Sequence, residues 1–141
     1  EYETKTVMIS VNPELFSRLL VNLVSNAYRY GRENGHIRVR LWQEDSSLVL
    51  SVADDGIGIA RNEQEKIFRR FYQADASRGG EGTGLGLAMV YEIARFYHGT
   101  VTVESVVDQG STFVVRMPAG QSSAAFSGLL PPFTNIFLII A

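Results

Sequence analysis

The sequence predicts an α/β fold, a two-layer sandwich in which a mixed five-stranded sheet carries three helices on one face. The composition, 45% hydrophobic and 20% charged over 141 residues, fits one globular domain with a real core. Short apolar or alternating runs also alternate along the chain with stretches of helical periodicity. Polar residues occur within the expected strands at Ser51, Thr102 and Arg116, so we expect the helices to cover only one face of the sheet.

Five short segments are expected to be strands, because each is apolar throughout or alternates apolar and polar side chains. They are residues 5–9, 36–42, 48–53, 100–104 and 112–117.

Three segments are expected to be helices. In the first, over residues 13–30, Asn12 suits the N-cap, Pro13 the first helical position, and Gly31 the stop. The other two are a short helix at roughly 62–71 and a longer one at about 85–97.

The charge balance argues against nucleic acid as a partner. The formal net charge is −2 and the pI is about 5.7, so the basic excess that binds phosphate backbones is missing. The chain has no cysteine, which fits a reducing compartment, and it begins at Glu1 without a basic and then apolar leader. We therefore expect a piece of a longer protein, located in the cytoplasm.

The composition changes after Pro118. Residues 119–128 are small and polar, and residues 129–141 are apolar with two prolines. The last apolar stretch, 136–141, is far below the ~20 residues that span a bilayer. We expect a domain over 1–118 and a tail over 119–141 without an assigned function, either a non-native extension or a docked strand.

A glycine-rich stretch, GGEGTGLGLA (79–88), leads into the last expected helix. Bare backbone before a helix N-terminus presents unpaired N–H groups and the positive end of the helix dipole to an anion. This pattern indicates phosphate binding, with a flexible loop as the simpler alternative. No Lys follows the glycines, so the stretch is not the phosphate loop that ends in Gly-Lys-Ser/Thr.

A second cluster, DDGIGI (54–59), follows an apolar strand. The carboxylate of Asp54 can accept a hydrogen bond from an exocyclic amine, while Gly56 and Gly58 let the backbone turn around a flat ring. Such a site would read adenine. The alternative is an ordinary Asp-Gly turn.

Two asparagines, Asn22 and Asn26, stand four residues apart on the first expected helix and therefore share a face with Arg29 and Tyr30. Two amide oxygens on one face can bind Mg²⁺, which prefers oxygen ligands and keeps waters and substrate phosphates around it. Arg29 would then meet phosphate charge. The simpler alternative is a solvated pair.

In this order and spacing, the elements resemble the catalytic and ATP-binding domain of sensor histidine kinases, in the wider family shared with DNA gyrase, the MutL repair ATPases and a heat-shock chaperone. The resemblance covers roughly residues 5–118 and implies a Bergerat-type ATP-binding fold with a mostly antiparallel sheet. The motifs are an asparagine box at 19–27 (LLVNLVSNA), a first glycine box at 54–59 (DDGIGI), a phenylalanine box at 66–72 (KIFRRFY), a second glycine box at 82–87 (GTGLGL) and a closing strand motif at 110–113 (GSTF).

The resemblance implies catalytic roles for the first helix. Asn26 would bind Mg²⁺ with Asn22 assisting, Arg29 would contact the phosphates, and Tyr30 would pack by the adenine or ribose. Asp54 would hold the adenine amine. The remaining nucleotide contacts that it implies are Gly56, Gly58, Ile59 and Thr112 for the base, and Gly82, Thr83, Gly84, Leu85, Gly86 and Leu87 for the phosphates.

The resemblance also implies a mobile lid over about 72–82, for which Phe68 and Phe71 are either anchors or plain core aromatics. Arg70 and Arg78 are either phosphate contacts or solvated side chains.

By the same resemblance, the protein is a histidine kinase that uses ATP and Mg²⁺. The acceptor histidine lies on a separate dimerising helical hairpin of the same protein, and a response regulator receiver domain then takes the phosphoryl group. Neither His36 nor His98 fits the acceptor motif. The fragment would be a monomer, cut from a homodimeric parent that is anchored in the cell membrane. Two alternatives stay open, a nucleotide-binding module without transfer and an anti-sigma factor that phosphorylates a serine.

Overall fold

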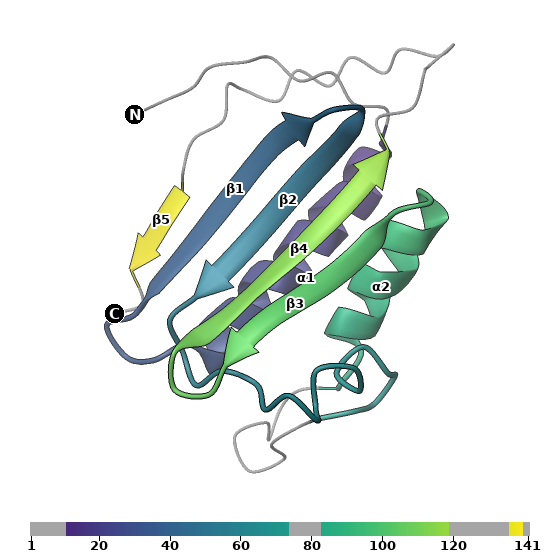
Figure 1. Cartoon of the computed structure of the whole chain (residues 1–141). Coiled ribbons are helices and arrows are strands. Elements are labelled where there is room, and N and C mark those ends of the chain that lie inside the picture. Colours follow the sequence, from purple (N-terminus) through teal and green to yellow (C-terminus); the bar gives the residue numbers. More distant parts are fainter. Residues whose placement is uncertain (1–10, 74–82, 119–135, 140–141) are drawn as a thin grey trace.

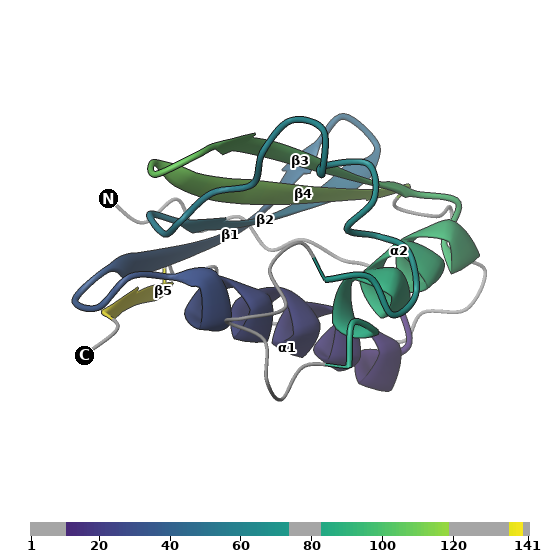
Figure 2. The same ribbon diagram turned by 90° about the horizontal axis from the view of Figure 1, so that it is seen from below.

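The computed structural model describes residues 11–73, 83–118 and 136–139. Strands β1 to β4 form an antiparallel sheet, and both helices lie against one face of it, so the fold is α+β (Figures 1 and 2). The helices are α1 (Pro13–Tyr30) and α2 (Gly86–Phe96), and the strands are β1 (His36–Glu44), β2 (Ser47–Asp54), β3 (Thr100–Val106), β4 (Gly110–Pro118) and β5 (Ile136–Ile139).

The sheet has the strand order β3-β4-β2-β1-β5. Every pair among the described strands is antiparallel, so the expectation of a mixed sheet was wrong for this part of the chain. The reason lies in the connections. A two-residue turn joins β1 to β2 and a three-residue turn joins β3 to β4, and such short links permit only antiparallel hairpins.

Strand β5 lies at one edge of the sheet, where it pairs with His36 to Val39 of β1 (Figure 1). The tail therefore contributes the fifth strand of the described sheet. The strand expected at residues 5–9 lies outside the described residues.

Helix α1 has the predicted bounds. The side chain of Asn12 accepts hydrogen bonds from the backbone N–H groups of Glu14 and Leu15, at 2.9 and 3.2 Å, and Gly31 follows the last turn. These bonds satisfy N–H groups that the first turn of a helix leaves unpaired. One face of the helix is buried against the sheet.

The expectation of a helix at roughly 62–71 was wrong. Its backbone instead forms successive turns, with the N–H of Lys66 bonded to the carbonyl of Glu63 and the N–H of Arg69 bonded to that of Lys66. Such three-residue spacing does not continue as an α-helix. The described residues therefore contain two helices. Ile67 is buried in the core and Phe68 packs against it, whereas Phe71 is 74% exposed.

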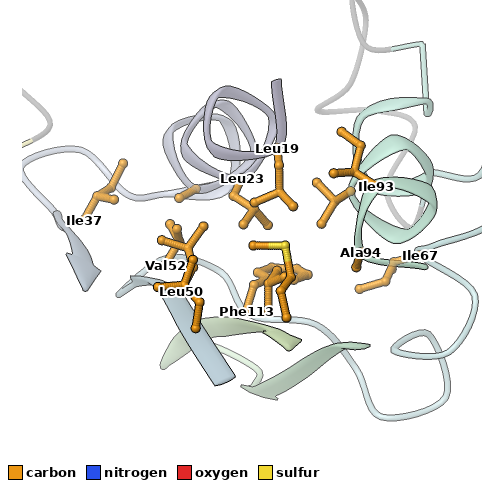
Figure 3. Close-up of a cluster of buried hydrophobic side chains, with 14 residues drawn as sticks. Leu19, Leu23, Ile37, Leu50, Val52, Ile67, Ile93, Ala94 and Phe113 are labelled. Atoms are coloured by element: carbon orange, nitrogen blue, oxygen red, sulfur yellow. The ribbon is translucent and has the colours of Figure 1, made fainter. Parts of the chain in front are cut away.

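The core lies between the sheet and the two helices. Figure 3 shows side chains of α1 and α2 meeting those of β2 and β4, with Phe113 at the centre and Ile67 of the turn segment beside α2. Both helices are thereby fixed against the sheet. Neither of these two described helices is both long and apolar enough to cross a membrane.

Candidate functional site

A cavity of about 450 Å³ opens between α1, the loop after β2, the turn segment and the start of α2. This volume is within the range of small-molecule sites. It is lined by Asn22, Ser25, Asn26, Arg29, Tyr30, Asp54, Ile57, Gly58, Ile59, Ala60, Glu63, Ile67, Tyr72, Gln73, Thr83, Gly84, Gly86, Leu87 and Ser111.

Helix α1 contributes a polar stripe to the cavity. Leu19, Leu23 and Ala27 are buried in the core, and the residues one position before the last two are Asn22 and Asn26. Because successive residues are rotated by about 100° around a helix, the stripe runs beside the buried face. The same stripe continues one turn further with Arg29 and Tyr30, where the guanidinium carbon lies 5.8 Å from the centre of the Tyr30 ring.

Asp54, the last residue of β2, places a carboxylate in the cavity wall. Its Oδ1 accepts the backbone N–H of Gly56 at 2.9 Å. Burial raises the pKa of Asp54, the backbone N–H groups of Gly56 and Ser111 oppose that rise, and the neighbouring charge of Asp55 adds to it. The carboxylate is therefore a fixed acceptor in a partly dry environment.

The loop after Asp54 makes close backbone contacts with two other segments. A Cβ at Gly56 would lie 2.0 Å from the carbonyl oxygen of Tyr30, and a Cβ at Gly58 would lie 2.1 Å from that of Val106. Gly58 also has a φ of +69°, which side chains disfavour. Only glycine fits these two positions.

Ser111 of β4 faces the cavity beside Asp54, its partner in the β2–β4 register. The hydroxyl of Ser105 donates to the carbonyl of Gly110 at 2.9 Å, so the bond of 2.8 Å between the two serine hydroxyls takes its proton from Ser111. The N–H of Ile59 also donates to Ser105, at 2.7 Å. Ser111 therefore presents only acceptor lone pairs to the cavity.

Thr112 does not line the cavity. Side chains alternate along β4, and Ser111, Phe113 and Val115 share the buried face toward the helices, so Thr112 is directed to the opposite face. Ser111, and not Thr112, therefore lines the cavity.

The start of α2 lies beside the asparagine stripe. A Cβ at Gly86 would be 3.3 Å from Oδ1 of Asn22. Leu85 occupies the N-cap and supplies no side-chain hydrogen bond, so the N-terminus of α2 is not capped by its own side chain. A helix start of this kind favours an anion, and here it lies next to amide oxygens that suit a cation.

Glu63 adds a second carboxylate to the wall. Its Oε1 lies 3.6 Å from Nζ of Lys66, whereas its buried Oε2 has no hydrogen-bond partner. Buried polar atoms normally have a partner, so this oxygen can accept from a ligand or from water.

Most of the predicted site residues lie around this cavity. The structure brings together around one cavity Asn22, Asn26, Arg29, Tyr30, Asp54, Gly58, Ile59, Thr83, Gly84, Gly86 and Leu87. Gly56, Leu85 and Thr112 are described but do not line it, because Gly56 packs against the end of α1 and Leu85 is the N-cap residue of α2. Gly82, Arg78 and most of the expected lid lie outside the described residues.

Several lining residues were not predicted, namely Ser25, Ile57, Ala60, Glu63, Ile67, Tyr72, Gln73 and Ser111. Ser25 and Ile57 stand inside motifs that the sequence analysis identified, and strand alternation could have indicated Ser111. Tyr72 and Gln73 begin the segment expected to be a lid, while Ala60, Glu63 and Ile67 lie in or beside the turn segment, for which a helix was expected.

The donor set fits Mg²⁺ better than it fits a metal that needs a full protein shell. Among the residues that the structure describes, no group of three His, Cys, Asp or Glu side chains could hold a metal ion. The amide oxygens of Asn22 and Asn26 are hard ligands, and Mg²⁺ accepts few of them when phosphates and waters complete its shell.

The two histidines lie outside the cavity lining and are exposed. His36, at the start of β1, bonds to Asp55: its backbone N–H donates to Oδ1 at 2.8 Å, and its ring Nδ1 lies 3.0 Å from Oδ2. Burial alone would raise the pKa of Asp55, but the bonds and the charge from His36 lower it. The pair ties the start of β1 to the residue that follows Asp54.

Residues 11–121 match the family of histidine kinase-, DNA gyrase B- and HSP90-like ATPases. The chain belongs to this family, as its motifs indicated. A similar protein is the circadian input-output histidine kinase CikA of Synechococcus elongatus, 39% identical over 109 residues, which are 76% of this chain and 14% of that protein. Another is the sensor histidine kinase WalK of Bacillus subtilis, 33% identical over 118 residues, 81% of this chain and 19% of that protein.

Solved structures show the same fold. The mycobacterial sensor histidine kinase MprB superposes with a TM-score of 0.72 at 27% identity, over 80% of each chain. Full-length ShkA in complex with AMPPNP superposes with a TM-score of 0.66 at 29% identity, over 78% of this chain and 22% of that one. The sequence is thus the ATP-binding catalytic domain of a sensor histidine kinase, and it spans less than a fifth of the two curated relatives named above.

Proposed function

We propose that this domain binds ATP in the cavity, with the adenine at Asp54 and the phosphates at the α1 stripe and the start of α2. The parent protein would transfer the γ-phosphoryl group to a histidine on a separate dimerisation hairpin, and a response regulator receiver domain would receive it from there. ShkA, part of which has the same fold as this chain, has been solved in complex with AMPPNP, and this supports the nucleotide assignment.

The observation that carries the proposal is the opposite chemistry of the two sides of the cavity. Asp54 and Ser111 form a floor of hydrogen-bond acceptors, which suits the two protons of an exocyclic amine. Guanine would place a carbonyl oxygen at the equivalent position, and two acceptors that face it leave it unpaired. The floor therefore selects adenine.

The other side combines amides, a cation and a helix start. Asn22 and Asn26 would hold Mg²⁺, which neutralises phosphate charge when it is bound. Arg29 supplies a further positive charge, and the N-terminus of α2 offers backbone N–H groups. Phosphoryl transfer depends mainly on positioning and charge neutralisation, so this set suffices for a domain that delivers the phosphoryl group to an acceptor elsewhere.

Calorimetric titration of the 141-residue chain with a non-hydrolysable ATP analogue tests this proposal. We expect saturable binding that Mg²⁺ strengthens, and much weaker binding of the matching GTP analogue. Absence of binding, or equal affinity for both nucleotides, would contradict it.

Transfer of the γ-phosphoryl group is tested separately, by adding the helical hairpin of the parent protein. Incubation with labelled ATP and Mg²⁺ should yield acid-labile phosphohistidine on the hairpin. Label on a serine of a partner protein would indicate the anti-sigma type of kinase, and nucleotide binding without label on the hairpin would indicate a module that only binds.

A further inference from the structure

Arg32, two residues after the end of α1, connects two backbone segments behind the cavity. Its Nη2 donates to the carbonyl oxygen of Gly56 at 3.1 Å and to that of Asp108 at 2.6 Å. Gly56 belongs to the loop after β2, and Asp108 to the turn between β3 and β4. Arg32 itself does not line the cavity.

The bond to Gly56 completes the fixation of one peptide group. The N–H of Ile57 donates to the carbonyl of Tyr30 at 3.1 Å, and the carbonyl of Gly56 in the same peptide group accepts from Arg32. The end of α1 thus holds this peptide on both of its polar edges. Since a peptide group is planar, the two bonds set its orientation.

The bond to Asp108 ties the turn between β3 and β4 to the same arginine. The N–H of Asp108 donates to the carbonyl of Ile57 at 2.8 Å, while its own carbonyl accepts from Arg32. The loop, the turn and the end of α1 therefore form a closed set of bonds around Arg32. Its guanidinium carries two N–H groups on Nη2, one for each carbonyl.

These hydrogen bonds around Arg32 determine the position of the acceptor floor, and of its Asp54 carboxylate in particular. The N–H of Gly56 orients the carboxylate of Asp54, and Ile57 and Gly58 line the cavity directly. A displaced peptide at Gly56 would therefore turn the carboxylate away from the amine that it is to accept. Small displacements of positioning groups have large effects on bound ligands.

We propose that Arg32 is a positioning residue that sets the adenine affinity and selectivity of the cavity without contact with the nucleotide. This inference rests on the proposed function, because it assumes that the base lies at Asp54. A purely structural role would change the stability of the fold but leave the preference for adenine over guanine unchanged.

Titrations of the 141-residue chain with the ATP and GTP analogues test the inference in three variants. Arg32→Ala removes both bonds, Arg32→Lys keeps the charge but replaces the planar guanidinium with a compact ammonium group, and Arg40→Ala removes an exposed arginine of β1 that lies outside the cavity lining. We expect Arg32→Ala to lower the affinity for the ATP analogue by roughly 5- to 10-fold, because it removes two charge-assisted bonds at a partly exposed site. It should also reduce the preference for the ATP analogue over the GTP analogue. The affinity and selectivity of Arg32→Lys should lie between those of Arg32→Ala and the wild type, and those of Arg40→Ala should match the wild type.

Amide hydrogen exchange without nucleotide gives an independent measurement. Faster exchange at Ile57 and Asp108 in Arg32→Ala is expected, because both amides belong to the set that Arg32 closes. Wild-type affinity and selectivity in Arg32→Ala, or unchanged exchange, would overturn the inference while the proposed function stands. A wild-type chain that binds neither analogue would overturn both.

Discussion

Replacement of Gly56 by alanine gives the sharpest test of how the base side of the cavity is built. The new Cβ would lie 2.0 Å from the carbonyl oxygen of Tyr30, and real Cβ contacts essentially never fall below 3.0 Å. Loop and helix end must therefore move apart by about 1 Å, which breaks or strains the two 3.1 Å bonds that join Gly56 and Ile57 to the end of α1. Overpacking together with two weakened hydrogen bonds should lower the free energy of unfolding by roughly 3–4 kcal/mol.

A shift of that size also moves the carboxylate of Asp54, so we expect the affinity for the ATP analogue to fall by about 10- to 100-fold. Gly99→Ala is the matched control, since its Cβ would lie 2.2 Å from the carbonyl oxygen of Arg116, a similar clash away from the cavity. Urea unfolding should show a loss of stability in both variants, and calorimetry should show weakened binding only in Gly56→Ala. Equal nucleotide affinity in the two variants would refute the reasoning.

Two further substitutions address the proposed base and metal contacts. Asp54→Asn should lower the affinity for the ATP analogue by roughly ten- to a hundredfold and reduce discrimination against the GTP analogue, since the amide offers a donor to the purine. Unchanged calorimetric affinities would exclude Asp54 as a contact of the base. The same variant should gain stability relative to wild type as the pH rises. The raised pKa of Asp54 means that the folded wild type holds its proton longer than the unfolded chain, so its stability falls from pH 3.8 upward through the raised pKa. Urea unfolding at several pH values measures this difference, and a constant difference contradicts it. Asn26→Asp should change the Mg²⁺ dependence of nucleotide binding, whereas Asn34→Asp, in an exposed turn, should not; identical Mg²⁺ titrations for both would exclude Asn26 as a ligand.

The sequence was informative where local rules decide the structure. Asn12 and Pro13 define the start of α1 because the cap depends on neighbouring residues alone. The four strands of the hairpins followed from short runs that are apolar or that alternate apolar and polar side chains. The segment at 62–71 was misjudged because its apolar residues suit a short helix, while the backbone bonds that form are those of turns.

The candidate site was predictable in composition but not in every detail. Motif resemblance assigned a base contact to Thr112, but the alternation of β4 places Ser111, and not Thr112, in the cavity wall. The role of Arg32 has no local signal, since its partners stand 24 and 76 residues away. Contacts of this kind are set by tertiary packing, which a single sequence does not display.

The position of β5 has a consequence for handling the domain. Because β5 covers only His36 to Val39, the outer edge of β1 from Arg40 to Glu44 has no strand beside it among the residues that the structure describes, while the other edge of β1 pairs with β2. Among the described residues, truncation after Pro118 would leave the whole outer edge of β1 without a partner strand, and unpaired strand edges can recruit other chains into larger sheets. Arg40 and Glu44 place charged side chains along the part of the edge that β5 leaves open, and such charges discourage edge-to-edge pairing, whereas β5 occupies the part next to the start of β1.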